Sequence, residues 1–164
     1  MKKVLSLLIV ATLVLGVFGY SQVETKASAG SAFNAVKSAY GKKFPLKSSN
    51  MINTTRKNIF GRYSKVLGVS AKNFTSYKAA RKSNGKTEYI AAIFRAGKGK
   101  VSKIKKALKK YVKKERSSNR NYFSNKGKRL LSRAKVGSKG RYVYLFILDV
   151  RGNKKAVSAF KRAA

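Results

Sequence analysis

The residue types that usually perform catalysis are scarce in this sequence. It has no histidine, no cysteine and only four acidic residues among 164. Paired-carboxylate catalysis would require two of Glu88, Glu115 and Asp149 to meet in the fold. A metal site would require His, Cys or several carboxylates. Serine and lysine are abundant, so a Ser–Lys dyad is conceivable, but no particular pair is favoured. The composition therefore predicts a protein that is not an enzyme and holds no metal or cofactor.

Two of the remaining acids have simple structural interpretations. Asp149 follows an apolar run and precedes Gly152, so we expect it to cap the last helix or to pair with a Lys or Arg. Glu115 has basic neighbours on both sides and is expected to form a local ion pair worth about 0–1 kcal/mol.

Positive charge is the main chemical property of the chain. Forty Lys and Arg residues against four acids give a formal net charge of +36. In an expected helix at 100–116, lysines project away from the apolar stripe at spacings where like charges repel by about 0.2–0.5 kcal/mol per pair. Far fewer lysines would keep such a face soluble, so the pattern favours contact with a polyanion. The residues predicted to bind it are Lys98, Lys100, Lys103, Lys106, Lys109, Lys110, Lys113, Lys114, Lys126, Lys128 and Arg129.

A Gly-Lys-Gly-Lys segment at 97–100 precedes this helix. Backbone N–H groups at a helix start can bind an anion. The segment lacks the spacing and the Lys-Ser/Thr ending of a nucleotide-binding P-loop. An ordinary strand-to-helix turn is the simpler interpretation.

Hydrophobic periodicity predicts the elements that position these residues. Asn84-Gly85 indicates a hairpin, and the apolar run at 141–150 is typical of a central strand covered on both faces. The helices are expected at 32–40, from Thr54 or Thr55 to Leu67 with a stop at Gly68, and at 100–116, 121–131 and 153–161. The strands are expected at 74–79, 88–94, 134–136 and 141–150. The order α-α-β-β-α-α-β-β-α predicts an α+β domain with a small antiparallel sheet of about four strands packed with helices.

Three aromatic residues, Tyr142, Tyr144 and Phe146, alternate along the last expected strand. Open to solvent, this face could stack nucleic-acid bases. The expected outcome is instead a covering helix, from either 32–40 or 55–67.

The N-terminus has the features of a secretory signal peptide. Lys2 and Lys3 precede an apolar run at 4–18, and small residues lie at 27–29. The apolar run is shorter than the roughly 20 residues of a membrane span. We therefore expect a signal peptide at 1–29 with cleavage near Ala29, followed by a single domain at 30–164 that is secreted or associated with the cell surface.

Four stretches carry a resemblance to a known family: FGRYSKVLGVS, EYIAAIFRAGKGKVSKIKKALKKYVKKER, NRNYFSNKGKRLL and GRYVYLFILDV. Through them, residues about 59–161 resemble the bacterial exported family called domain of unknown function 4358. The resemblance implies export. It implies no catalytic residue, because no activity is established for the family. This chain lacks the lipoprotein cysteine of many members and has Lys or Arg where relatives tend to be acidic or neutral.

Together, charge and leader predict a non-enzymatic basic domain that binds anionic polymers of the cell envelope. Its partner would be teichoic acid, acidic polysaccharide or anionic lipid. One alternative is an extracellular nucleic-acid-binding protein. Another is a hydrolase with an unrecognised site, which would need a cleft holding a perturbed lysine or Glu88. A further alternative is that the charge reflects the organism's surroundings rather than a ligand.

Overall fold

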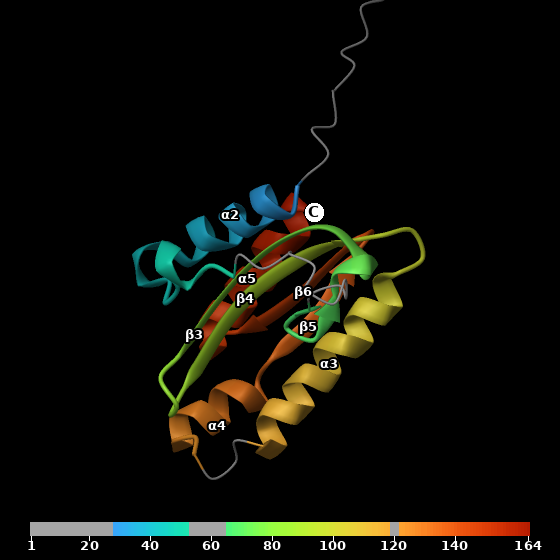
Figure 1. Ribbon diagram of the computed structural model, residues 1–164. Coiled ribbons are helices and arrows are strands. Elements are labelled where there is room, and N and C mark those ends of the chain that lie inside the picture. The colour runs from blue at the N-terminus through green and yellow to red at the C-terminus, as the bar shows by residue number, and fades with distance from the viewer. Residues whose placement is uncertain (1–27, 53–64, 119–121) are drawn as a thin grey trace, which may run out of the picture.

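A four-stranded antiparallel sheet lies at the centre of the computed structural model, which describes residues 28–52, 65–118 and 122–164 (Figure 1). The strand order is β3-β4-β6-β5. The strands are β3 (Phe74–Ser83), β4 (Glu88–Ala96), β5 (Lys135–Lys139) and β6 (Tyr142–Ile147).

Helices cover both faces of this sheet (Figure 1). On one face lie α2 (Ala29–Tyr40) and α5 (Val150–Ala163), which pack against each other. On the other face lie α3 (Val101–Ser118) and α4 (Asn125–Ser132). We call these pairs the α2–α5 layer and the α3–α4 layer. Because each layer has its own apolar face, the domain contains two hydrophobic cores, one on each side of the sheet.

The central strand β6 contributes to both cores, as its apolar sequence predicts. Every residue of β6 is buried. Val143 and Leu145 face the α3–α4 layer, whereas Tyr144 and Phe146 face the α2–α5 layer. Alternation of side chains along a strand explains this division. Both faces of β6 are apolar because a helical layer covers the sheet on each side.

The predicted α+β class and its four-stranded antiparallel sheet are confirmed. The hairpin at Asn84-Gly85 is also confirmed, with Ser83 paired to Glu88 across it. Strand β3 continues to Ser83, four residues beyond its predicted end, and α5 begins at Val150, three residues earlier than predicted.

The prediction of a helix ending at Leu67 is wrong over its last residues. Lys65–Val66 and Val69–Ser70 form a short hairpin, β1 and β2, in which Val66 pairs with Val69. Leu67 and Gly68 make the turn with positive φ angles of 50° and 77°. A glycine with positive φ ends a helix or turns a hairpin equally well, so Gly68 could not distinguish the two. The rest of that expected helix lies outside the described residues.

The folded domain includes residues just before the predicted cleavage point. Ser28 caps α2 by accepting a hydrogen bond from the Ser31 N–H (2.9 Å), while the Ser31 hydroxyl accepts one from the Ser28 N–H (2.7 Å). Ala29 is buried. The remainder of the predicted leader lies outside the described residues, and no helix within the described ranges is both long and apolar enough to span a membrane.

Candidate functional site

Helix α3 separates its apolar and basic residues onto opposite sides. Ile104, Leu108 and Val112 are buried at a four-residue spacing, which aligns them along one side of an α-helix. The six lysines predicted for polyanion contact in this helix are all exposed. They are Lys103, Lys106, Lys109, Lys110, Lys113 and Lys114. No hydrogen bond or ion pair joins their side chains to another described residue.

The turn before α3 carries the next two predicted residues. Lys98 is exposed and Lys100 is partly buried. The Lys100 N–H donates a hydrogen bond to the Gly97 carbonyl (3.0 Å), and Gly99 has a φ of 67°. This is the geometry of an ordinary strand-to-helix turn.

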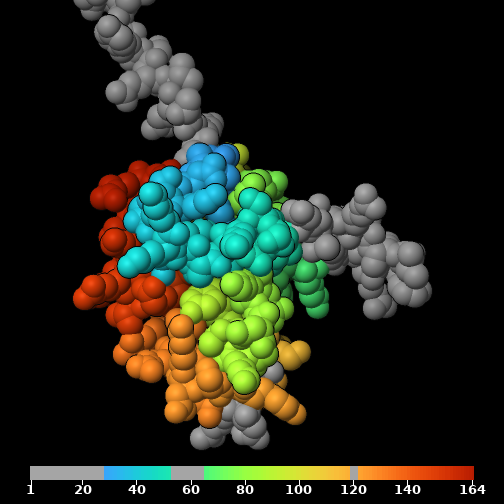
Figure 2. All heavy atoms as spheres, turned by 90° about the vertical axis from the view of Figure 1, so that its left-hand side faces the viewer, coloured from blue at the N-terminus to red at the C-terminus, as the bar shows by residue number. Residues whose placement is uncertain are grey.

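Helix α4, which carries Lys126, Lys128 and Arg129, is fixed against the tip of the β3–β4 hairpin (Figure 2). The Ser124 N–H and hydroxyl both donate to the Lys86 carbonyl, at 3.0 and 3.1 Å. Gly127 allows the close approach, since a Cβ there would lie 2.2 Å from the same carbonyl oxygen. The three predicted basic residues of α4 are all exposed.

Arg116 ties α3 to α4. Its Nε and Nη2 donate to the Leu131 carbonyl at 3.0 and 2.6 Å, and Nη2 also reaches the Ser132 carbonyl at 3.1 Å. A cation at a helix C-terminus satisfies carbonyls that have no partner within the helix.

All eleven residues predicted to bind a polyanion lie in the α3–α4 layer or in the turn that leads into it. We call these eleven residues the α3–α4 surface.

Basic residues also occur in the α2–α5 layer, where they make up a smaller share of each helix than in α3. Helix α3 has eight among its eighteen residues, α5 has five among fourteen, and α2 has Lys37 alone among twelve. The basic residues of α5 are Arg151, Lys154, Lys155, Lys161 and Arg162. The charge is therefore spread over both layers, with its greatest concentration on α3.

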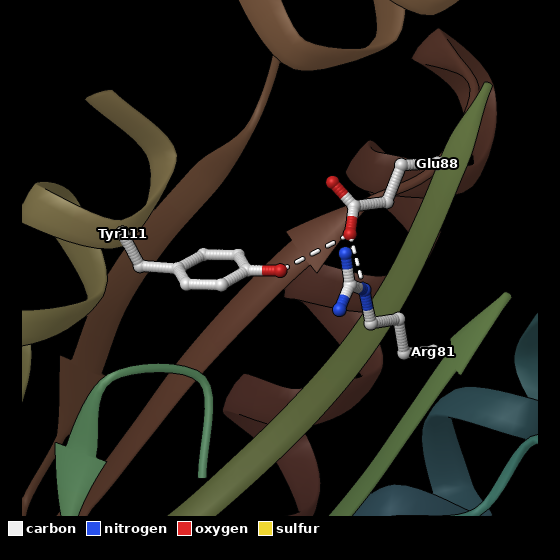
Figure 3. A network of polar contacts seen from close by, with 3 residues as sticks. All are labelled: Arg81, Glu88 and Tyr111. Carbon is white, nitrogen blue, oxygen red and sulfur yellow. Dashed lines mark hydrogen bonds and ion pairs between the residues drawn. The ribbon is translucent and has the colours of Figure 1, made fainter. Parts of the chain in front are cut away.

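A buried carboxylate that sequence reasoning did not assign lies beneath α3 (Figure 3). Glu88, the first residue of β4, has no solvent exposure. Arg81 Nε donates to its Oε1 at 2.5 Å, and the Tyr111 hydroxyl donates to the same oxygen at 3.1 Å. The second oxygen, Oε2, is directed away from both and has no partner among the described residues. The sequence did contain a signal for this burial, because Glu88 lies on the same face of its strand as the buried residues Ile90 and Ala92.

This arrangement orients the carboxylate rather than exposing it to a substrate. Burial and the negative charge of Glu88 raise the pKa of Tyr111 well above its ordinary value, although Arg81 opposes the shift. Tyr111 therefore remains a protonated hydrogen-bond donor. Glu88 lines none of three clefts found between described residues.

Asp149 is the N-cap of α5, as predicted. Its Oδ1 accepts from the Gly152 N–H at 2.7 Å, and its Oδ2 accepts from the Tyr40 hydroxyl at the end of α2. Burial tends to raise the pKa of this carboxyl. The hydrogen bonds from Tyr40, Gly152 and Arg151 outweigh burial and hold the pKa below its usual value.

The aromatic face of β6 is closed. Phe160 of α5 lies against Tyr144 and Phe146, with ring centroids 4.7 and 6.5 Å apart. All three rings are buried, so they offer no surface for stacking bases. The covering helix is α5, whereas a helix at 32–40 or 55–67 was expected to cover this face. Helix α2 packs over β3 and β4. Among the described residues, nowhere do three or more potential metal ligands of the His, Cys, Asp or Glu type come together.

These features define a small basic α+β domain with one sheet between two helical layers. The family model described as "Domain of unknown function (DUF4358)" matches residues 49–148, and the chain belongs to that family. The match spans the sheet and the α3–α4 layer, and it excludes α2 and α5. No curated protein matches the chain, and no solved structure does.

Proposed function

We propose that this domain is a non-enzymatic binding module whose ligand is an anionic polymer of the cell envelope, such as teichoic acid or acidic polysaccharide. One observation carries the proposal. The exposed side of α3 presents six lysines whose side chains are bonded to no other described residue. The predicted leader supports a location outside the cytoplasm, where such polymers are found.

The energetics of α3 favour a bound polyanion. Each lysine near an anionic surface gains about 1 kcal/mol, and the attraction decays over a Debye length of about 8 Å at physiological salt. A bound polymer would also relieve repulsion between lysines three and four positions apart. The helix is held rigidly by its buried stripe and by Arg116, so little ordering of backbone is required on binding.

The acids provide little support for chemistry. Glu88 is enclosed with Arg81 and Tyr111, and Asp149 uses both oxygens to hold α5 and α2. A hydrolase that uses a carboxylate would need that group at an accessible reacting centre. A binding role requires only the surface charge.

Retention on isolated Gram-positive cell walls during a salt gradient tests the proposal. We expect retention at low salt and release as salt rises. The variant Lys106→Gln/Lys110→Gln/Lys113→Gln should elute at clearly lower salt than the matched variant Lys154→Gln/Lys155→Gln/Lys161→Gln, because both lose three charges but only the first changes α3. No retention at low salt, or retention that strong salt leaves unchanged, would contradict the proposal. Equal losses in the two variants would show that overall charge, rather than α3, determines binding.

Competition separates this function from nucleic-acid binding. Purified teichoic acid and duplex DNA are added to wall-bound protein at equal phosphate concentration and low salt. We expect teichoic acid to displace the protein and DNA to be the weaker competitor. Displacement by DNA at a lower concentration than teichoic acid would favour the nucleic-acid alternative, whose affinity should fall steeply with salt.

A further inference from the structure

A cleft of about 270 Å³ lies between α4 and the first turn of α5, and two residues of the α3–α4 surface, Lys126 and Arg129, line it. Its floor is apolar and consists of Leu130, Leu148 and Val150. Val150 is 43% exposed, which is unusual for a large aliphatic residue of this domain. Its rim carries the cationic side chains of Lys126, Arg129 and Arg133.

The walls of this cleft are held in place by a buried side chain. Asn153 is only 2% exposed. Its Nδ2 donates to the Arg133 carbonyl at 3.0 Å and to the Leu148 carbonyl at 3.1 Å, while its Oδ1 accepts from the Leu148 N–H at 3.2 Å. The end of α4 and the start of α5 are thereby fixed relative to each other. The cleft is preformed, which lowers the ordering cost of binding a ligand.

The cleft also attracts anions. The side chains of Lys126, Arg129 and Arg133 are exposed and form no ion pair with a described residue. Asp149 lines the cleft too, but its oxygens already accept from the Gly152 N–H and the Tyr40 hydroxyl. Three cations against one carboxylate leave a positive rim. Guanidinium groups are well suited to phosphate because they can donate two parallel hydrogen bonds.

We propose that this cleft binds a phosphate-bearing lipid, with the phosphate on the Arg129 and Arg133 rim and the adjoining methylene groups on the apolar floor. The proposal rests on the proposed function, because it names one envelope component and gives it a site of its own. A phosphate polymer without an apolar part would use the rim and leave the exposed side chain of Val150 uncovered. A lipid contacts both the cationic rim and the apolar floor, and each methylene group that it buries strengthens binding about fourfold.

A second cleft of about 200 Å³ in the α2–α5 layer provides a matched control. It also has an apolar part, and Lys37, Lys47 and Lys78 lie along it. It has no arginine among its lining residues and is more polar. Binding driven only by positive charge near an apolar surface would treat the two clefts alike.

The test is a titration of the isotopically labelled protein with octyl phosphate below its critical micelle concentration, followed by amide chemical shifts. We expect shifts at Leu130, Leu148 and Val150, and binding about tenfold tighter than that of inorganic phosphate. Octyl glucoside, which has the chain without the charge, should bind more weakly. Arg129→Gln/Arg133→Gln should weaken octyl phosphate about tenfold, whereas Lys37→Gln/Lys47→Gln should leave it unchanged.

Two results would overturn the proposal. One is octyl phosphate binding no more tightly than inorganic phosphate, and the other is a shift pattern centred on the cleft beside Lys37. Val150→Ser tests whether the apolar floor contributes to binding. It should weaken the binding of octyl phosphate and leave the binding of inorganic phosphate unchanged. The α3 triple variant separates this proposal from the proposed function, because it should lose wall retention and keep octyl phosphate binding. If octyl phosphate does not bind the cleft of a protein that still elutes from cell walls as expected, only the lipid-site proposal is contradicted, and the proposed function stands.

Discussion

Glu88 and Asp149 are carboxylates on opposite sides of the sheet, and both accept a hydrogen bond from a tyrosine. They differ in almost every other respect. Glu88 has no exposure, pairs with Arg81 and leaves one oxygen without a partner among the described residues. Asp149 is exposed, caps α5 and uses both oxygens. Glu88 is therefore a charge enclosed by the fold, whereas Asp149 joins the ends of two helices at the surface.

The comparison indicates why these acids persist in so basic a chain. The negative charge of Glu88 depends on one cation, because burial makes an uncompensated charge very costly. Asp149 depends on neutral donors and on solvent. Each acid has a structural task, while most basic side chains lie at the surface without a described partner. Structural acids and surplus surface cations should respond to mutation in opposite ways.

The largest effect is expected when Glu88 loses its cation. Arg81→Met should lower the free energy of unfolding by about 3–5 kcal/mol, because it would leave the buried Glu88 carboxyl without its cationic partner. Glu88→Gln should cost less, because Arg81 is 42% exposed and can be solvated. Urea denaturation measures both. In the Glu88→Gln background, Arg81→Met should be far less damaging, and an equally large loss there would show that Arg81 acts through packing instead.

Gly152 tests the contact between Asp149 and Tyr40. A Cβ at position 152 would lie 2.0 Å from Cε2 of the Tyr40 ring, so Gly152→Ala must displace Tyr40 from Asp149. We expect a loss of about 1–3 kcal/mol from this overpacking, measured by thermal and urea unfolding. In a Tyr40→Ala background the same change should become neutral or stabilising by up to about 1 kcal/mol, because alanine favours the helix. A loss that persists in that background would rule out the ring as its cause.

Asp149→Ala should cost about 0.5–2 kcal/mol at neutral pH, the usual range for losing an N-cap. The effect depends on pH. Because the folded-state pKa of Asp149 lies below its usual value of 3.8, its contribution is present above that value and disappears as pH falls through the folded-state pKa. The difference in stability between the two proteins should therefore be largest at about pH 6 and should narrow as pH falls below 3.8. A constant difference across this range would mean that the carboxylate charge is not involved.

Short sequence patterns were sufficient to predict much of this fold. The apolar run at 141–150 predicted a strand covered on both faces, although the strand ends at Ile147, three residues before its predicted end. The stripe at Ile104, Leu108 and Val112 predicted which lysines of α3 are exposed. Asp149 before Gly152 predicted a cap. In each case, a few neighbouring residues contain all the physical information that determines the feature.

Features that depend on distant segments could not be predicted in this way. Arg116 resembles any other basic residue of α3 until the end of α4 is brought beside it. The cleft between α4 and α5 is formed by segments far apart in the sequence, which Asn153 joins through its hydrogen bond to the Arg133 carbonyl. Glu88 lies between these cases. Alternation along its strand was an unused signal for its burial, and the cation that allows this burial comes from the neighbouring strand.

The smallest effect, and one of opposite sign, is expected on α3. Lys110 has like-charged neighbours at Lys106, Lys113 and Lys114, so Lys110→Gln should raise the free energy of unfolding by a few tenths of a kcal/mol at low salt. It should also lower the salt at which the protein leaves cell walls. Lys37→Gln in α2 is the matched control. Lys37 is the single basic residue of its helix and lies in its last turn, so its loss should not raise the free energy of unfolding and should change elution less than Lys110→Gln does. If Lys110→Gln instead destabilises the protein, Lys110 belongs with Arg116 among the structural cations. The distinction between structural acids and surplus surface cations would then fail at α3, the helix with the most basic residues.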